Sequence, residues 1–481
     1  MDKLNFRKVN NYLWEIPNKF QKKIQVPARI YVDEKMLEQV FKDRSVKQLV
    51  NLTALPGIVN YSLAMPDIHE GYGFPIGGVA AMDSENGIIS PGGVGYDINC
   101  GMKLLKTGYS EEEIRPHLDK LATEIQNEVP SGLGQGREIK LDIAELDKIL
   151  KTGAKKLVEK GYGEKEDIEN CEANGCLEQA DPSLVSDKAK NRGRNQLGTL
   201  GSGNHFLEIQ KVDKIFDEKA AKIIGLSKGE TTIMIHTGSR GLGHQIATDY
   251  IKLMMKAMQK YKIDLPDREL ACVPFKSSEG QRYFKSMCAG ANYAWANRQM
   301  IVYYIRKAWK NVLGFSKTSA LTIVYDVAHN IAKIENHKIN GENKELVVHR
   351  KGATRAFPPN HLEIPKKYRE IGQPVLIPGS MGTASYVLIG QESGKDAWYS
   401  TCHGAGRKMS RHAAIKRTRG EEVIKELKEK KILIKCRSMR GIAEEAPLAY
   451  KDIDDVVEVV HQAGLSRKVA RLVPLAVIKG E

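Results

Sequence analysis

The sequence predicts an α/β protein in which mixed β-sheets are surrounded by helices. Short runs rich in β-branched and apolar residues, at 231–235, 320–325 and 386–389, are typical of buried strands. Longer stretches at 244–260 and 290–313 repeat apolar residues at helical spacing. A chain of 481 residues suits about three domains, or one large catalytic body with insertions.

The composition indicates a partner that carries many negative charges. Lys and Arg number 74 against 59 Asp and Glu, which gives a formal net charge of +15. Nucleic acid is the obvious polyanion, although a surface rich in Lys and Glu can also be simply solvated. Seven cysteines without framework spacing, and a start without an apolar signal core, favour the cytoplasm. No apolar run approaches the roughly 18 residues that span a bilayer, so we expect no membrane partner.

In chain order, the first half combines a loop, a helix and an irregular segment. Residues 65–73 break into a loop, which precedes a glycine-rich stretch at 91–100 by about one strand. Ser110 and Glu113 form a capping box that starts an amphipathic helix. The segment 130–193 is charged and weakly periodic, which predicts a surface insertion.

Two cysteines in this insertion, Cys171 and Cys176, are close enough in sequence to hold zinc together. Two unpaired structural thiols fit them better. The second half of the chain also contains a predicted insertion, at 244–313, which carries the two long helical patterns. Further helices are expected near 420–431 and 453–461.

The glycine-rich stretch at 91–100 places Asp97 and Cys100 three positions apart. Its glycines keep other side chains away from the two polar groups. A carboxylate offers hard oxygen and a thiolate offers soft sulfur, so the pair could bind one metal while the sulfur bridges to a second. Small polar residues among glycines also build ordinary turns, and for this stretch alone both interpretations stay open.

Three histidines favour the metal interpretation. His236 and His329 each follow a predicted buried strand, and ligands gather where strands end. With His205, Asp97 and Cys100 they make five groups, more than one tetrahedral metal needs, so two metals sharing Cys100 fit better. Such pairs lie about 3.5–4 Å apart and clamp phosphoryl oxygens. Any one of these histidines alone would more often be a hydrogen-bonded core residue.

A second site is predicted at 403–407. This glycine-rich segment leaves a strand-like run at 397–401 and enters a helical run at 408–414. A glycine-rich loop at a helix N-terminus binds anions, because unpaired N–H groups and the helix dipole face the phosphate. The His403 imidazole is also a competent nucleophile toward a phosphoryl group. A plain phosphate-binding loop is the alternative.

Basic residues follow this loop closely. Six cations and no acid lie between Arg407 and Arg419, a pattern that RNA backbone phosphates explain better than a solvated face. Similar cations flank other glycine-rich segments. The RNA-binding candidates are Arg192, Arg194, Arg240, Lys351, Arg407 and Arg411, and Arg350 and Arg355 belong to the same pattern.

The chain resembles the RtcB-type RNA-splicing ligases through four motifs in the expected order, at 97–100, 201–208, 236–241 and 403–407. The resemblance spans essentially the whole chain, so it implies one domain over 1–481, a single compact RtcB-like body with its site at strand ends. It implies a GTP- and manganese-dependent ligase that joins RNA 3′-phosphate or 2′,3′-cyclic phosphate ends to 5′-hydroxyl ends. The substrates would be tRNA exon halves in splicing and broken RNA ends in repair, with an activating protein of the archease type as a further partner.

Carried over residue by residue, the resemblance makes Cys100 a bridge between two manganese ions, with Asp97 and His205 on one ion and His236 and His329 on the other. His403 would carry GMP as the catalytic nucleophile. The nucleotide-binding set would be Asn204, Glu208, Pro378, Ser380, Ser385, Ala405, Gly406, Tyr450 and Lys479, in which Glu208 reads guanine.

The expected reaction opens any cyclic phosphate, transfers GMP from GTP to His403 and then to the RNA 3′-phosphate, and ends with attack by the 5′-hydroxyl. Asp67 and His69 could position the attacking groups. Two other functions stay open at this point: a two-metal phosphodiesterase or phosphatase acting on RNA ends, and a non-catalytic RNA-binding module. The same ligands would also take zinc or cobalt.

Overall fold

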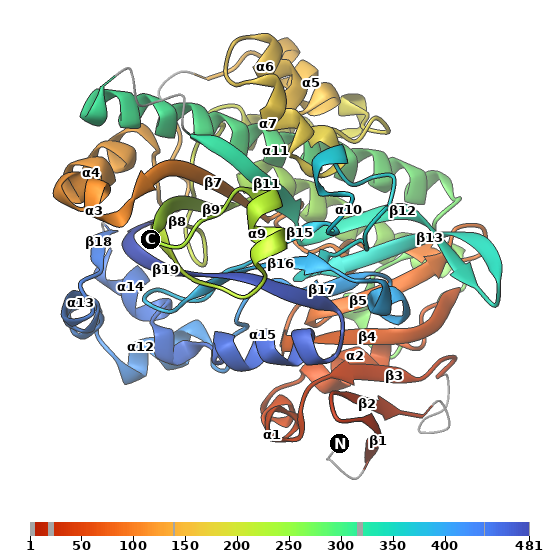
Figure 1. Cartoon of the computed structure of the whole chain (residues 1–481). Coiled ribbons are helices and arrows are strands. Elements are labelled where there is room, and N and C mark those ends of the chain that lie inside the picture. Colours follow the sequence, from red (N-terminus) through yellow and green to blue (C-terminus); the bar gives the residue numbers. More distant parts are fainter. Residues whose placement is uncertain (1–4, 18–23, 138–139, 315–320, 437, 481) are drawn as a thin grey trace.

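Two mixed β-sheets of seven and eight strands organise the chain in the computed structural model, which describes residues 5–17, 24–137, 140–314, 321–436 and 438–480. Helices pack around both sheets (Figure 1). The mixed α/β class that the sequence predicts is therefore confirmed. Residue 320, the first of the predicted strand at 320–325, lies outside the described residues.

The seven-stranded sheet is antiparallel except where β3 pairs with β4. Its strands, in spatial order within the described chain, are β1 (Arg7–Asn10), β2 (Leu13–Ile16), β3 (Ala28–Tyr31), β4 (Ile58–His69), β5 (Ile76–Asp83), β13 (Glu342–Lys351) and β12 (Asn330–Ile339). Two short pairs accompany the large sheets, β6 (Ile88–Ile89) with β10 (Val273–Pro274) and β14 (Ala353–Arg355) with β17 (Ser400–Cys402).

The eight-stranded sheet contains most of the strands that the sequence predicts. In spatial order they are β11 (Thr322–Ala328), β7 (Gly101–Ser110), β9 (Glu230–Thr237), β8 (Phe206–Ile215), β19 (Ser466–Lys479), β16 (Ser385–Gly390) and β15 (Pro374–Ile377). The remaining strand, β18 (Leu433–Cys436), runs parallel to β19 beside its last four residues. β15 and β16 pair antiparallel and are joined by the loop at 378–384, and β16 contains the strand predicted at 386–389.

Apolar side chains cover both faces of this sheet, which explains its nearly continuous apolar strands. In β9, Ile233 and Ile235 pack on one face with side chains of α4 (Leu118–Glu128) and α11 (Ser278–Leu313). Met234, which lies between them in sequence, packs on the opposite face beside α9 (Glu218–Ile224). Each fully buried side chain of this size contributes about 1.5–3 kcal/mol, so this packing stabilises the strands that carry the site.

Two long helices, α10 (Arg240–Lys260) and α11, begin earlier than predicted. The side chain of Ser277 caps α11 by accepting a hydrogen bond from the Gly280 N–H. Most of α11 between Ser286 and Val302 is buried, so it lacks the single apolar stripe from which a helix start is normally recognised.

The segment 130–193 folds into helices although its sequence is weakly periodic. They are α5 (Ile143–Thr152), α6 (Ala154–Glu159), α7 (Lys165–Glu169) and α8 (Asp187–Gly193), and Figure 1 shows α5–α7 gathered beside α11. Cys171 and Cys176 are buried and free, as expected for structural thiols. Neither belongs to a group of three metal-binding side chains in the described part of the chain.

The remaining helices include several that the sequence predicts. The capping box of Ser110 and Glu113 is present at the start of α3 (Glu111–Ile114), and a 3-10 turn containing Pro116 separates α3 from α4. The predicted tail helices are α13 (Gly420–Glu429) and α15 (Ile453–Gln462). The others are α1 (Glu34–Leu37), α2 (Ser45–Leu52), α12 (Arg411–Arg417) and α14 (Met439–Glu444). In the described ranges, no helix combines the length and apolar composition needed to cross a lipid bilayer.

Two local predictions around the second site are wrong. Residues 397–401 are not one strand, because a 3-10 helix ends at Ala397 and both Trp398 and Tyr399 adopt left-handed backbone conformations before β17 begins. The segment 403–407 does not enter a helix directly, because Ser410 caps α12 and the helix begins at Arg411. Residues 408–410 therefore separate the glycine-rich loop at 403–407 from the helix N-terminus.

Candidate active site

Four neighbouring strands deliver the predicted metal ligands to one edge of the eight-stranded sheet. Because β7 is antiparallel to both β9 and β11, the start of β7 lies beside the ends of the other two. Cys100 immediately precedes β7, His236 is next to last in β9, and His329 immediately follows β11. β8 is antiparallel to β9 and begins directly after His205, with Phe206 opposite His236.

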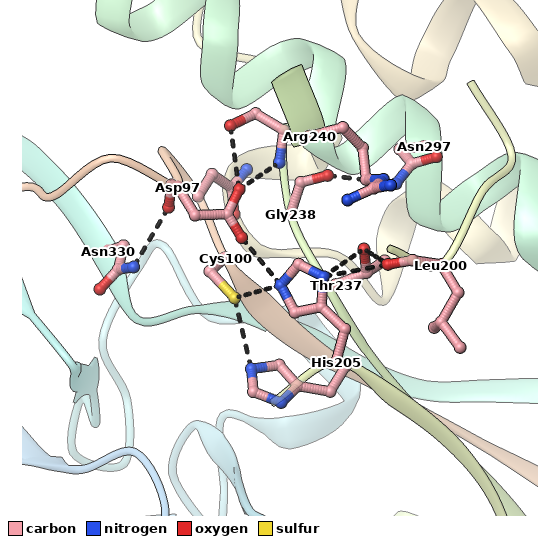
Figure 2. A network of polar contacts seen from close by, with 12 residues as sticks. Asp97, Cys100, Leu200, His205, Thr237, Gly238, Arg240, Asn297 and Asn330 are labelled. Atoms are coloured by element: carbon pink, nitrogen blue, oxygen red, sulfur yellow. Dashed lines mark hydrogen bonds and ion pairs between the residues drawn. The ribbon is translucent and has the colours of Figure 1, made fainter. Parts of the chain in front are cut away.

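The Cys100 sulfur lies between two sets of donor atoms. Its Sγ is 3.4 Å from His205 Nε2 and 3.3 Å from His236 Nε2. On one side the Asp97 carboxylate is 2.9 Å from His205 Nε2, and Figure 2 shows both Asp97 and Cys100 directed at this ring. On the other side His236 Nε2 and His329 Nε2 are 3.3 Å apart.

These five residues form two groups of three that share Cys100, one with Asp97 and His205 and one with His236 and His329. The spacing fits two metal ions, because the donor atoms in each group lie within 4.8 Å of one another. His205 Nδ1 donates to the Leu200 carbonyl oxygen at 3.0 Å, so Nε2, which faces Asp97 and Cys100, is the nitrogen that would bind a metal. The geometry thus brings together all five predicted ligands.

Electrostatics suit metal binding. Although burial opposes it, the hydrogen bond from His205 lowers the pKa of Asp97 to about 2, so this ligand is ionised. Burial holds the pKa values of His236 and His329 well below the usual range, which keeps both imidazoles neutral. Burial and then the Asp97 charge raise the pKa of Cys100 well above that of a free thiol. A bound cation supplies the positive charge that a thiolate needs here.

One buried arginine of α11 ties the ligand-bearing segments together. Arg298 Nη1 donates to the backbone carbonyl oxygens of Asn99 and Thr237, each at 2.8 Å. Asn99 directly precedes Cys100 in the sequence, and Thr237 directly follows His236. The guanidinium also pairs with Asp326 of β11, at 2.8 Å from Nη2 to Oδ1. The three segments therefore share one cation, and the sequence offers no periodic or spacing signal for it.

His403 lies beside the metal-binding groups and is held by Asp67 of β4. The Asp67 Oδ2 atom accepts hydrogen bonds from His403 Nδ1 at 2.5 Å, from His403 N at 3.0 Å and from Gly404 N at 3.3 Å. The His403 ring makes an edge contact with His329, with centroids 4.9 Å apart. Because Nδ1 is bonded to Asp67, Nε2 is the ring nitrogen that remains for chemistry.

Two features of the surroundings keep this pair in place. Gly406 has a φ of +72°, and a Cβ at this position would lie 2.2 Å from the Asp67 carbonyl oxygen, so the loop can approach β4 only with glycine here. The His69 ring stacks near His403, with centroids 6.4 Å apart, and its Nδ1 donates to the Asp67 carbonyl oxygen at 2.8 Å. Burial lowers the pKa of His69 to about 4, so this ring is neutral.

A cavity of about 1020 Å³ opens in front of His403. Seven of the nine predicted nucleotide-binding residues line it, namely Asn204, Pro378, Ser380, Ala405, Gly406, Tyr450 and Lys479. The other two, Glu208 and Ser385, lie in the adjoining strands, where Gln210 Nε2 donates to both, at 2.7 Å to Glu208 Oε2 and 3.0 Å to Ser385 Oγ. Burial raises the pKa of Glu208 to about 8.

The predicted RNA-binding cations fall into three kinds. Arg407 and Arg411 line the cavity and pair with Glu445, a buried acid that the sequence analysis missed. Its Oε2 atom also accepts from the Tyr450 hydroxyl, so Glu445 organises this wall. Glu445 directly follows Glu444 at the end of α14, and two adjacent acids at a helix end carry no sequence signal for such a role.

The second kind comprises Arg192, Arg194 and Arg240, each of which is hydrogen-bonded within the protein. Arg192 is exposed and donates to Gln245 at 3.0 Å, and Arg194 donates to the Leu141 carbonyl oxygen at 2.8 Å. Arg240 Nε donates to the Thr199 hydroxyl at 3.2 Å.

The third kind of cation is buried, which excludes direct contact with RNA. Lys351 donates to the carbonyl oxygens of Tyr72 and Phe74. The buried Arg350 pairs with Glu335. The buried Arg355 pairs with Glu172 and Glu363.

Comparisons with known proteins agree with this geometry. The family model described as "tRNA-splicing ligase RtcB" matches residues 48–480. A tRNA-splicing ligase RtcB of Thermococcus kodakarensis is 53% identical over 98% of both chains, and one of Aeropyrum pernix is 52% identical over 98% of this chain and 99% of its own. An RNA-splicing ligase RtcB of Mycobacterium bovis is 51% identical over 90% of this chain and all of its own. The chain belongs to the RtcB family of tRNA-splicing ligases.

Proposed function

We propose that the chain is a GTP- and manganese-dependent RNA ligase that joins 3′-phosphate or 2′,3′-cyclic phosphate ends to 5′-hydroxyl ends, in tRNA splicing and RNA repair. The observation that carries this proposal is the hydrogen bond between Asp67 Oδ2 and His403 Nδ1. It leaves His403 Nε2 free at the mouth of a nucleotide-sized cavity and next to two metal-binding groups.

In the first transfer, His403 Nε2 attacks the α-phosphorus of GTP, an N–P bond forms and pyrophosphate leaves. The ring then carries GMP through Nε2 and keeps its Nδ1 proton, so it is positively charged, and the Asp67 carboxylate stabilises that charge. Although burial opposes it, the His403 charge holds the pKa of Asp67 below its usual range, which keeps the carboxylate ionised for this role.

In the second transfer, an oxygen of the RNA 3′-phosphate attacks the same phosphorus and the N–P bond breaks. This yields RNA that ends in a 3′-diphosphate-linked guanosine and regenerates His403. The RNA 5′-hydroxyl then attacks the 3′-phosphate, loses its proton and expels GMP, which forms the new phosphodiester. A cyclic phosphate must first be hydrolysed to the 3′-phosphate.

Two manganese ions would be held by Asp97, Cys100, His205, His236 and His329, and they would neutralise phosphate charge and orient the reacting groups. The neutral imidazoles and the ionised Asp97 carboxylate are the forms that such ions require. Arg407 and Arg411 at the cavity wall would offset the remaining charge on the nucleotide and RNA phosphates.

Guanine recognition is proposed for Glu208, whose ionised carboxylate accepts from guanine N1–H and the exocyclic amine. Adenine offers an acceptor at N1, which would leave this buried carboxylate unpaired. Lys479 donates to the carbonyl oxygens of Gly203 and His205, which fixes the strand end beside Glu208. We propose the cytoplasm as the compartment, and RNA ends and an archease-type activator as the partners.

One labelling experiment tests this function against the phosphodiesterase alternative. Incubation with manganese and α-labelled GTP should leave acid-labile label on the chain, and the variant His403→Ala should acquire none. Retention of wild-type labelling in that variant would place the nucleotide elsewhere. A metal-loaded wild-type protein that opens cyclic phosphate ends or removes terminal phosphates but never acquires label would establish the phosphodiesterase or phosphatase instead.

A further inference from the structure

Three aromatic rings lie together on the side of the metal-binding groups where Asp97 is open to solvent. Tyr72 and Tyr96 have ring centroids 5.6 Å apart, and Tyr96 stacks on His244 with centroids 4.9 Å apart and planes 25° from parallel. His244 is exposed, whereas Tyr72 and Tyr96 are half-buried. We name Tyr72, Tyr96 and His244 the aromatic column.

One ring of the aromatic column is adjacent in sequence to a predicted metal-binding residue. Tyr96 directly precedes the ligand Asp97, whose side chain is 27% exposed, while Cys100, His236 and His329 are each at most 3% exposed. The nucleotide cavity is lined by His236 and His403 but by neither Asp97 nor the column. The metal-binding groups therefore have a second accessible side, and the aromatic column borders it.

Charges around the column are unequally distributed. His244 lies on α10 one turn after Arg240, and the exposed Arg192 of α8 lies against the same helix, with its Nε 3.3 Å from a Cβ built on Gly241. Burial, and then the Arg192 charge, lower the pKa of His244, so the ring is neutral and suited to stacking. The carboxylate of Glu269 lies on the Tyr72 side, where it accepts from the Gly73 N–H at 2.9 Å.

We propose that the aromatic column is a stacking site for one unpaired nucleobase of the RNA substrate, close to the reacting end. The base would lie on the exposed face of His244, and its flanking phosphates would lie toward Arg192 and Arg240, away from Glu269. Single-stranded nucleic acids bind in this way to aromatic rings beside cations, because every base has a face that stacks. This inference rests on the proposed RNA ligase function and deepens it.

The test uses the full-length protein loaded with manganese, and single-stranded RNAs that carry either a 5′-hydroxyl or a 3′-phosphate. In each RNA, 2-aminopurine or an abasic nucleotide replaces the bases one to four positions from the end. Stacking quenches 2-aminopurine, so one position should lose fluorescence on binding to the wild-type protein. An abasic nucleotide at that position should weaken binding by on the order of 10-fold.

The protein variants are His244→Ala, Tyr96→Leu and the conservative Tyr96→Phe. His244→Ala and Tyr96→Leu should weaken binding of intact RNA by the same order, and should lose nothing further with the abasic RNA. Tyr96→Phe keeps the ring and should bind like the wild type. The matched control is Phe216→Leu, because Phe216 is also exposed beside lysines, at the opposite end of β8 from His205.

Two outcomes would overturn the stacking site. One is an absence of any quenched position, and the other is a loss of affinity in His244→Ala that is equally large for intact and abasic RNA. Labelling of the wild-type protein by GTP separates this result from the proposed function. Labelling without base-dependent binding rejects the stacking site alone, whereas base-dependent binding without labelling rejects the ligase mechanism and keeps the stacking site.

Discussion

Asp67 Oδ2 and His403 Nδ1 are 2.5 Å apart, and the same carboxylate oxygen accepts two backbone N–H groups from the loop that carries His403. Asp67 therefore fixes both the ring and its backbone. The variant Asp67→Asn should keep the loop nearby but lose the charge that stabilises the guanylylated ring. We expect transfer of GMP to His403 to slow by on the order of 10²–10⁴-fold. Single-turnover labelling with GTP measures the rate, and a wild-type rate would contradict the assignment.

The roles of His403 and Cys100 separate when the RNA is supplied already activated. In the proposed mechanism His403 is needed only to accept GMP, so His403→Ala should fail with GTP but still seal RNA that carries a 3′-diphosphate-linked guanosine. Cys100 is shared by both metal-binding groups, so Cys100→Ala should fail at both steps. Gel assays with both RNAs measure the two outcomes. Ligation of activated RNA by Cys100→Ala at the wild-type rate, in matched manganese, would refute a shared thiolate.

The raised pKa of Glu208, about 8, gives GTP binding a defined pH dependence. Below this pH the carboxyl group is protonated in the free protein, and the proposed contact with guanine requires it to lose that proton. Affinity for GTP should therefore rise roughly 10-fold per pH unit up to about pH 8 and level off above it. Glu208→Gln should lose this slope and much of the preference for GTP over ATP. Calorimetry from pH 6.5 to 8.5 tests both, and an unchanged slope in Glu208→Gln would assign the titration to another group.

Arg298 should control metal affinity without touching a metal. Arg298→Lys keeps the buried charge, but a lysine cannot hydrogen-bond to Asn99, Thr237 and Asp326 at the same time in this geometry. The ligand-bearing segments should therefore lose their alignment. We expect manganese affinity to fall roughly 10- to 100-fold. The matched control is Arg306→Lys, about two turns along the same helix, which disturbs the ion pair with Asp167 at 2.6 Å.

Both arginine variants should lower the free energy of unfolding, but only Arg298→Lys should weaken manganese binding in a titration. Equal losses of affinity in the two variants would show that the effect arises from general destabilisation.

The cations after His403 should differ in their effect on RNA binding. Lys416 and Arg417 are exposed on α12, and replacing either with Ala should lower the salt dependence of RNA binding by about one counterion, at equal cost for every sequence. Arg407 is 15% exposed and bound to Glu445 and Tyr450, so Arg407→Ala should weaken GTP binding as well. Filter binding across salt concentrations measures the slopes, and an unchanged slope in Arg417→Ala would remove it from the RNA contacts.

The metal-binding groups could be predicted from sequence because their geometry follows from the strands. His236 and His329 end buried strands, and Cys100 precedes another, so antiparallel pairing brings them to one edge. Such strands are recognised by their apolar and β-branched residues, and glycines indicate the loops at their ends. The sequence therefore indicated both which side chains could bind a metal and where the strands place them.

The supporting residues could not be predicted because their partners are distant in sequence. Arg298 and Asn99 are separated by 199 positions, and Asp67 and His403 by 336. The prediction of a strand at 397–401 is wrong for a different reason. Aromatic residues favour strands in general, but Trp398 packs against His337 in the core and takes a left-handed conformation to reach it. Tertiary packing overrides the local preference there.

The position of β19 has a consequence for how the protein is made. This strand lies between β8 and β16 in the middle of the eight-stranded sheet, yet it spans Ser466–Lys479. Just before a ribosome translates β19, all five predicted metal-binding residues and His403 have been synthesised, but β8 and β16 each present an unpaired edge. Such edges bind other chains readily, so the nascent protein is most exposed to aggregation just before synthesis of β19 joins the two halves of its sheet.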